Sequence, residues 1–279
     1  MGDDFAVEVR QRAGGGCINA AYVIEGCGRR FFVKVNEAHG EPMFEAEAAG
    51  LRELAAAGPL RVPTPVCWGA VAGTAFLTLE YIPLGPTTAA ASARLGRGLA
   101  QLHRARATQH GWHMDNTIGA TPQPNGPLQD WVSFYRERRL LFQLSLAAQA
   151  GHPALERRGR RLAESLEAFF PGYAPVPSLL HGDLWSGNCA ADDDGDPVLF
   201  DPAVYYGDRE SDLAMTELFG GFPAAFYDAY REAWPLDEGY AVRRTLYQLY
   251  HVLNHLNLFG GGYAAQAERM IDRLLGQVR

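Results

Sequence analysis

Three side chains in the second half of the sequence have the types and spacing of a phosphoryl-transfer site. Asn188 follows Asp183 by five residues, and Asp201 follows Asn188 by thirteen. In such sites one Asp accepts the proton of the attacking hydroxyl, while an Asn and a second Asp hold the Mg²⁺ ions that bridge the nucleotide phosphates. The spacing therefore predicts transfer from ATP to a hydroxyl, with Asp183 as the base and Asn188 and Asp201 as Mg²⁺ ligands.

The residues around this set favour a small-molecule kinase over a protein kinase. Protein kinases separate their catalytic Asp and metal-binding Asn by the same number of residues. Here, however, Gly182 stands where protein kinases carry Arg, and Asp201 is followed by Pro-Ala in place of Phe-Gly. These two departures indicate a kinase that acts on small molecules.

A plain turn is the alternative interpretation of residues 183–188, because Ser, Gly and Asn are all favoured in turns. The residues that follow favour the catalytic interpretation. The apolar run 197–200 comes directly after an acidic Gly turn at 192–195, which predicts a hairpin. Such a hairpin would return Asp201 to the side of Asp183 and Asn188, and a plain turn does not require a carboxylate there.

Length and composition predict an ordinary globular protein. The chain has 279 residues with 47% hydrophobic and 20% charged content, which suits one large domain or two lobes. A net charge of −7 argues against a nucleic-acid or anionic-membrane surface, and no apolar run approaches the ~20 residues of a membrane span. The acidic start predicts no signal peptide. The four cysteines lack a Cys-x-x-Cys spacing, so we expect reduced thiols in a cytoplasmic protein.

A glycine-rich loop near the N-terminus is a candidate phosphate-binding element. Gly14, Gly15 and Gly16 lie between two strand-like runs, and the free N–H groups of such a loop can hold phosphate oxygens. The loop matches neither Walker A nor the complete Gly-x-Gly-x-x-Gly pattern. A flexible hairpin tip is therefore the alternative.

Lys34 lies inside the apolar strand-like run 30–35. A lysine in that setting either reaches out from a sheet edge or pairs with an acid. In kinases a lysine on this strand contacts the nucleotide phosphates and pairs with a helix glutamate. Residues 44–54 are strong helix formers, and we predict Glu47 as the partner of Lys34, with Glu45 as the second choice.

A Pro/Gly stop at 83–86 follows the buried strand predicted for 75–82 and divides the chain. We predict an N-terminal nucleotide-binding lobe over 1–82 and a helical catalytic and acceptor-binding lobe over 83–279. At the junction, the Glu80 carbonyl and the Ile82 amide are predicted to contact adenine. The fold class is therefore α+β, with a small antiparallel sheet and one main helix in the first lobe.

Helical patterns dominate the second lobe. One helix is predicted to begin at Thr87 or Thr88, and a long functional loop covers 111–123. The charged residues Asp208 and Arg209 either shape an acceptor pocket or brace the catalytic loop, and we favour bracing. Further helices are predicted over 127–149, 154–170, 211–233, 238–258 and 263–278.

Taken together, these pieces resemble the fructosamine kinase (ketosamine-3-kinase) family within the aminoglycoside phosphotransferase-like kinases. The resemblance covers nearly the whole chain. The most specific blocks are Gly-Gly-Gly-Cys-Ile-Asn at 14–19, Gly-Trp-His-Met-Asp-Asn-Thr-Ile-Gly at 111–119, His-Gly-Asp-Leu-Trp-Ser-Gly-Asn at 181–188 and Asp-Pro-Ala-Val-Tyr-Tyr-Gly-Asp-Arg-Glu at 201–210. The blocks 219–222 and 253–259 also look like the family.

The resemblance implies a two-lobed protein-kinase-like fold and ATP-dependent, Mg²⁺-dependent phosphorylation of the sugar 3-hydroxyl of ketosamines. The unstable 3-phosphate then releases the amine, so the role is protein deglycation. It implies that Trp185 faces the sugar, and we place His181 on the substrate side as well. The acceptors would be free ketosamines or glycated protein amines. We expect a monomer, and a redox-linked dimer through Cys17 is a hypothesis that the family suggests.

Two other functions compete with this interpretation. One is another small-molecule kinase, of the aminoglycoside or choline type, whose cationic acceptors call for clustered acids or aromatic cages. The second is a nucleotide-binding module without catalysis. The absence of any one of four site residues would favour this alternative. All four are present: Lys34, Asp183, Asn188 and Asp201.

Overall fold

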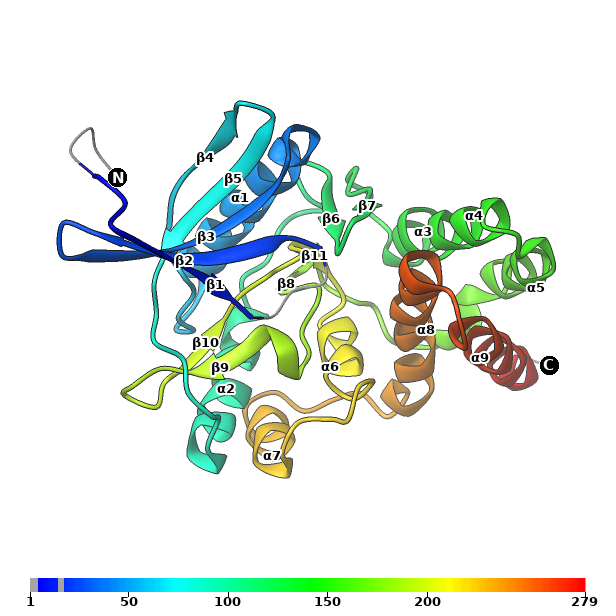
Figure 1. Cartoon of the computed structure of the whole chain (residues 1–279). Helices are drawn as coiled ribbons and strands as arrows, with labels where there is room; N and C mark the ends of the chain where they lie inside the picture. Colours follow the sequence, from blue (N-terminus) through cyan, green and yellow to red (C-terminus); the bar gives the residue numbers. More distant parts are fainter. Residues whose placement is uncertain (1–4, 15–17, 279) are drawn as a thin grey trace.

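The computed structural model describes residues 5–14 and 18–278 and contains a sheet-rich end and a helix-rich end (Figure 1). At the sheet-rich end, five antiparallel strands lie in the order β1-β2-β3-β5-β4. The strands are β1 (Val9–Ala13), β2 (Ala20–Gly26), β3 (Arg29–Glu37), β4 (Pro65–Val71) and β5 (Thr74–Glu80). The single long helix of this end, α1 (Glu41–Ala57), packs against β4 and β5. This arrangement is the antiparallel sheet with one main helix that the sequence predicted.

Helix α1 forms where strong helix formers follow a proline in its first turn. Its buried face contains Phe44, Ala48 and Leu51, which recur at the spacing of one helical face and pack with Leu77 and Leu79 of the sheet. Glu47 is therefore carried next to this apolar face, where it can meet a strand side chain.

Most of the remaining chain is helical and lies below and beside the sheet (Figure 1). The helices are α2 (Ala89–Leu102), α3 (Trp131–Phe134), α4 (Leu141–Gln149), α5 (Pro153–Ala163), α6 (Glu210–Thr216), α7 (Ala224–Ala233), α8 (Tyr240–Phe259) and α9 (Tyr263–Gln277). The short helical turns are η1 (Ala38–Gly40), the π-helix η2 (Tyr135–Leu140), η3 (Leu166–Phe169) and η4 (Ser186–Asn188).

Three two-stranded ribbons connect these helices. The antiparallel pairs are β6 (Asn116–Ile118) with β7 (Thr121–Gln123), β8 (Ser178–Leu180) with β11 (Tyr205–Gly207), and β9 (Cys189–Ala191) with β10 (Pro197–Leu199). The β9–β10 pair is the hairpin predicted between the two metal-ligand candidates, and its turn contains Gly195 with a φ of +78°.

Several helix predictions are confirmed, and others are wrong in extent. Thr88 caps α2 by accepting a hydrogen bond from the Ala91 N–H at 3.1 Å, as predicted. The helix predicted over 211–233 is instead two helices, because Gly220 and Gly221 take φ values of +91° and +76° that a helix does not allow. The helix predicted over 154–170 ends at Ala163 and continues only as the turn η3.

The chain leaves the five-stranded sheet after Glu80, and the next element is α2. The division at residue 82 stays a prediction, because the core runs without a break from the sheet side to the helical side. Leu51 and Leu77 belong to the same buried cluster as Leu99 and Leu253. In the described part of the chain, no helix is both long enough and apolar enough to cross a membrane.

Candidate active site

A buried lysine joins two carboxylates where the sheet meets the helical part. Lys34 Nζ lies 2.5 Å from Glu47 Oε1 and 2.5 Å from Asp201 Oδ1. Lys34 is only 6% exposed, whereas the Asp201 side chain is 42% exposed. Burial disfavours the lysine charge, but Asp201 and Glu47 outweigh this, so the pKa of Lys34 is raised above its usual value. The predicted pairing with Glu47 rather than Glu45 is confirmed.

Packing of α1 on the segment after Asp201 brings this cluster together. A Cβ on Gly50, which lies one turn beyond Glu47, would come within 3.1 Å of the Val204 side chain and 3.7 Å of Pro202. A larger residue at this position would push α1 away from the segment. The glycine therefore allows α1 to approach residues 202–204 closely enough for Glu47 and Asp201 to share one lysine.

The catalytic-loop candidates converge on the same place. Asn188 Nδ2 donates to the Asp183 backbone carbonyl at 2.8 Å and to Asp183 Oδ2 at 3.1 Å. The same nitrogen lies 3.5 Å from the carbonyl of Asp201. Asp183, Asn188 and Asp201 are therefore neighbours, as the hairpin argument predicted.

Asp183 has the electrostatic surroundings of a general base. Burial, followed by the charge of Asp201, raises the pKa of Asp183 to about 7, although the hydrogen bond from Asn188 acts in the opposite direction. A base whose pKa lies near neutrality combines the ionised form with a useful affinity for the proton.

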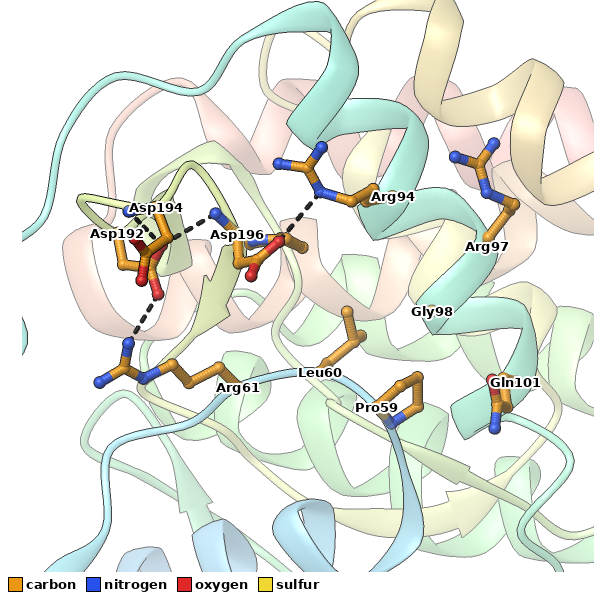
Figure 2. A pocket seen from close by; sticks show the side chains of 11 residues that line it. Pro59, Leu60, Arg61, Arg94, Arg97, Gly98, Gln101, Asp192, Asp194 and Asp196 are labelled. Atoms are coloured by element: carbon orange, nitrogen blue, oxygen red, sulfur yellow. Dashed lines mark hydrogen bonds and ion pairs between the residues drawn. The ribbon is translucent and has the colours of Figure 1, made fainter.

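The β9–β10 hairpin is fixed at its turn by two arginines from other elements. Arg61 donates to Asp192 at 2.6 Å, and Arg94 pairs with Asp196 at 3.1 Å (Figure 2). A cavity of about 430 Å³ opens beside this turn, between the hairpin and α2. None of the predicted site residues lines it, so we treat it as part of the hairpin's support.

Asp212 is the residue that braces the catalytic loop, and sequence reasoning missed it. Its two carboxylate oxygens accept from the backbone N–H groups of His181 and Gly182, each at 2.8 Å. His103 Nε2 lies 3.1 Å from the same carboxylate. Burial alone would raise the pKa of Asp212, but the His103 hydrogen bond and these other partners lower it. The only sequence signal was a charged cluster in the right region, which favoured Asp208 and Arg209.

Asp208 and Arg209 lie elsewhere. Asp208 accepts from the hydroxyls of Tyr173 and Tyr247, and Arg209 binds Tyr230 together with backbone carbonyls at 234–235. Arg209 is linked to Asp212 only indirectly. It binds Tyr230, and Tyr230 contacts His103, which lies beside the Asp212 carboxylate. The bracing hypothesis is therefore correct for the segment but wrong for these two residues as direct contacts.

His181 does not present its side chain to an acceptor. The residue is fully buried, Nε2 lies 3.1 Å from the Phe200 carbonyl, and Nδ1 accepts from the Asp183 N–H at 3.3 Å. Nε2 thus ties the loop to the residue before Asp201, and Nδ1 fixes the backbone of the loop itself. We therefore exclude His181 from the residues proposed to touch substrate.

Trp185 lies two residues after Asp183, is exposed, and begins a row of aromatic rings. The residue is 38% exposed, and its ring meets Phe219 edge-on with centroids 6.3 Å apart. Phe219 contacts His255 at 4.7 Å, and His255 contacts Phe259 at 5.6 Å. The family-like blocks 219–222 and 253–259, to which the sequence assigned no role, therefore meet through Phe219 and His255, and Phe219 links them to Trp185.

The remaining predictions concern the nucleotide. Gly14 follows β1 and is exposed, whereas Gly15, Gly16 and Cys17 lie outside the described residues. Ile82 is buried directly after the sheet, and the Glu80 side chain is bound by Arg61 and Thr64. The predicted adenine contacts of the Glu80 carbonyl and the Ile82 amide stay predictions.

The donor atoms fit a magnesium ion. Mg²⁺ takes one or two protein oxygen ligands and completes its shell with water and phosphate oxygens. Lys34 donates to Asp201 Oδ1, and Asn188 makes its hydrogen bonds through Nδ2. Among the described residues, Asp201 Oδ2 and Asn188 Oδ1 are therefore available to bind a metal ion. The described residues contain no cluster of three His, Cys, Asp or Glu side chains that could hold a metal ion.

The fold is that of the protein-kinase-like phosphotransferases. The aminoglycoside phosphotransferase APH(4)-Ia superposes with a TM-score of 0.63 at 16% identity, over 98% of this chain and 95% of that one. A crystal structure assigned as a fructosamine-3-kinase from Haemophilus somnus superposes much better. Its TM-score is 0.89 at 31% identity, over 97% of this chain and 92% of the other.

Sequence comparison narrows this class to one family. The model of the Fructosamine kinase family matches residues 1–277. A probable ketoamine kinase of Synechocystis is 47% identical over 98% of this chain and 92% of its own. A chloroplastic protein-ribulosamine 3-kinase of Oryza sativa is 44% identical over 95% of this chain and 78% of its own. The chain belongs to the fructosamine kinase family.

Proposed function

We propose that this protein is an ATP-dependent kinase that phosphorylates the 3-hydroxyl of ketosamines, the adducts of sugars with amines. The observation that carries the proposal is the convergence of Lys34, Asp183, Asn188 and Asp201 in a member of the fructosamine kinase family. The relatives described as ketoamine and ribulosamine kinases support the acceptor class. Fructosamine, ribulosamine and erythrulosamine adducts of lysine or of protein amines are all within this class.

Asp183 is the proposed general base. Its carboxylate takes the proton of the acceptor hydroxyl as the hydroxyl oxygen attacks the γ-phosphorus, and the bond to the leaving ADP oxygen breaks. The hydrogen bond from Asn188 orients the carboxylate. No residue needs to become phosphorylated, because the acceptor oxygen attacks the γ-phosphorus directly.

Lys34, Glu47, Asn188 and Asp201 are proposed to hold the nucleotide. Lys34 binds phosphate oxygens and Glu47 keeps its ammonium group in place, while the oxygens of Asn188 and Asp201 hold Mg²⁺. Bound Mg²⁺ neutralises the charge that develops on the phosphate oxygens. Gly14, Gly15 and Gly16 are proposed to cover the phosphates, and the backbones of Glu80 and Ile82 to contact adenine.

Trp185 is proposed to form one wall of the acceptor site. Its exposed ring lies two residues after the base and is supported by Phe219. An aromatic face can pack against the sugar chain and align the 3-hydroxyl with Asp183, and alignment of this kind can lower a barrier by several kcal/mol.

A substrate panel tests the proposal. Purified protein with ATP and ribulose-lysine or fructose-lysine should form ADP and the 3-phosphate, followed by slow release of free lysine. Kanamycin and choline serve as acceptors for the competing small-molecule kinases. ADP formation with either of these, and with no ketosamine, would reject the acceptor class and leave the kinase assignment intact.

A cytoplasmic location, a monomeric state and a redox-linked dimer through Cys17 are further proposals. Gel filtration tests the monomer. Non-reducing gels of the wild type and of Cys17→Ser after peroxide treatment test the dimer, and identical monomer bands for both proteins would exclude it.

A further inference from the structure

Three amide side chains from the β6–β7 region form a buried cluster beside the segment that follows Asp201. Asn116, Gln123 and Asn125 are 9%, 1% and 0% exposed. Asn116 Nδ2 donates to the Val204 carbonyl at 2.8 Å. Gln123 Nε2 donates to the Ala203 carbonyl at 3.1 Å and to Asn116 Oδ1 at 2.8 Å. Two amides thus hold two consecutive backbone carbonyls of this segment.

The cluster is itself anchored to the helical part of the molecule. Gln123 Oε1 accepts from the Tyr250 hydroxyl of α8 at 2.7 Å. Asn125 donates to Asn116 Oδ1 at 2.8 Å and accepts from Arg139 Nη2 of the π-helix at 2.7 Å. Because a buried amide loses free energy with every unmade hydrogen bond, this complete set of partners favours one arrangement.

The segment that the cluster holds needs external support. Asp201 has a φ of +55°, in the left-handed region that costs free energy for residues other than glycine. Pro202 has no N–H with which to bind its neighbours. On the opposite side, the Ala203 N–H donates to the His181 carbonyl at 2.8 Å. The backbone after Asp201 is therefore held between the catalytic loop and the amide cluster.

We propose that Asn116 and Gln123 are positioning residues for phosphoryl transfer. By holding the Ala203 and Val204 carbonyls they fix the backbone direction at Asp201, and so keep its carboxylate on Lys34 and its backbone carbonyl beside Asn188. The two amides hold the segment that begins with Pro202-Ala203, at the place where protein kinases carry Phe-Gly. The inference rests on the proposed role of Asp201 as a Mg²⁺ ligand.

The test replaces Gln123 and measures two properties that do not require catalysis. Gln123→Met keeps the length of the side chain and removes its hydrogen bonds. Mg²⁺ should strengthen ADP binding, and the Mg²⁺ concentration that gives half of this increase in affinity should be about 10-fold higher in the variant. A 10-fold change is about the lower end of the effect typical when a hydrogen-bond partner of a metal ligand is lost. The affinity for ADP without Mg²⁺ should stay within about twofold of the wild type, since only the carboxylate orientation changes. Backbone amides at 201–206 should also exchange with deuterium faster in the ligand-free variant.

Gln143→Met is the matched control. Gln143 is another fully buried amide, bonded to Asn254 and Asn257 but not to residues 201–204. It should lower the melting temperature to a similar extent but leave the Mg²⁺ dependence and the exchange at 201–206 unchanged. If Gln123→Met does not fold, Asn116→Asp takes its place, because it keeps the acceptor Oδ1 and replaces the donor to Val204 with a carboxylate oxygen that repels the Val204 carbonyl.

Three results would overturn the inference. The first is a wild-type Mg²⁺ dependence of ADP binding in the Gln123 or Asn116 variant. The second is an equal shift in the Gln143 control, which would show a general loss of stability. In the third, Mg²⁺ does not strengthen ADP binding even in the wild type. That last result would remove the proposed metal site, and the positioning role with it.

Discussion

Two clusters of buried charge differ in how completely they are closed. In the first, which we call the open cluster, Lys34 joins Glu47 and Asp201, and the Asp201 side chain remains 42% exposed. In the second, the closed cluster, Arg243 binds Glu210 through two nitrogens at 2.7 and 3.0 Å, and neither residue is more than 1% exposed. Both contain a buried cation paired with an acid, but the Arg243–Glu210 pair is closed to solvent, whereas Asp201 is not.

In the closed cluster Arg243 and Glu210 are buried and bound to each other, whereas the side chain of Asp237 at its edge is 40% exposed. Arg243 also binds Asp237 at 2.6 Å, and its guanidinium lies 3.8 Å from the ring centroid of Tyr173. Asp208 beside it accepts from two tyrosine hydroxyls. The open cluster keeps one Asp201 oxygen uncommitted. Burial of charge alone therefore does not identify an active site, and an accessible carboxylate beside other residues of a phosphoryl-transfer set, as Asp201 is beside Asn188 and Asp183, is the better criterion.

The largest effect is expected from replacing Asp183, the proposed base. Asp183→Asn should lower kcat by roughly 10²- to 10⁴-fold, because the amide cannot accept the proton of the acceptor hydroxyl. ATP binding and the melting temperature should change little. Steady-state kinetics with a ketosamine and calorimetric titration with nucleotide measure both, and a kcat like that of the wild type would contradict the assignment.

The next effect concerns the proposed Mg²⁺ ligand in the open cluster. Asp201→Asn should weaken Mg²⁺-nucleotide binding and activity together, by at least the roughly 10-fold seen when an outer partner of a metal ligand is lost. Asn188→Ala should act in the same direction more mildly. Nucleotide titrations at several Mg²⁺ concentrations check this, and unchanged affinity and Mg²⁺ dependence in Asp201→Asn would require another role for the carboxylate.

Replacing Lys34 and Arg243, the cations of the two clusters, tests the comparison directly. Arg243→Met leaves Glu210 buried without its partner and should cost about 3–5 kcal/mol of unfolding free energy. Lys34→Met should cost less, because Asp201 can be solvated, but should abolish most activity. Urea unfolding and kcat/KM give the two readouts. The comparison fails if Arg243→Met lowers kcat/KM without loss of stability.

The double variant Arg243→Met with Glu210→Gln sharpens this test. Removing the uncompensated acid should recover part of the stability lost in the single variant, so the two changes should be non-additive. Additive losses would mean that packing of the arginine stem, rather than its charge, explains the single variant.

The smallest effect is expected from a buried group outside both clusters. Burial lowers the pKa of His110 to about 4, although the charge of Asp130 acts against this. Between about pH 6.5 and pH 4 the unfolded chain binds a proton that the folded chain does not, so the unfolding free energy should fall with falling pH. His110→Phe, which keeps a ring against Trp131, should reduce that slope by about one proton. Urea unfolding at pH 7, 6 and 5 measures it, and identical slopes would exclude the contribution.

Much of the site could be predicted because its residues form short local patterns. The spacing of Asp183, Asn188 and Asp201 across one hairpin required only a turn between two strands, and both the hairpin and the convergence are confirmed. Lys34 stood out because a charged residue inside an apolar strand needs a partner. The composition and the family-specific blocks were sufficient for the fold class and for the family.

Tertiary structure decided which distant residues support that site. Asp212, Gln123 and Asn116 act through hydrogen bonds to the backbone of other segments, at separations of 30–31 residues for Asp212 and 80–88 for the two amides. Backbone atoms have no signature in the side-chain sequence, so nothing marks their partners. The same reason explains His181, where the motif predicted substrate contact while the packing used both ring nitrogens for the backbone. Residue types and spacing determined the chemistry of this chain, and the folded backbone determined which polar side chains hold that chemistry in place.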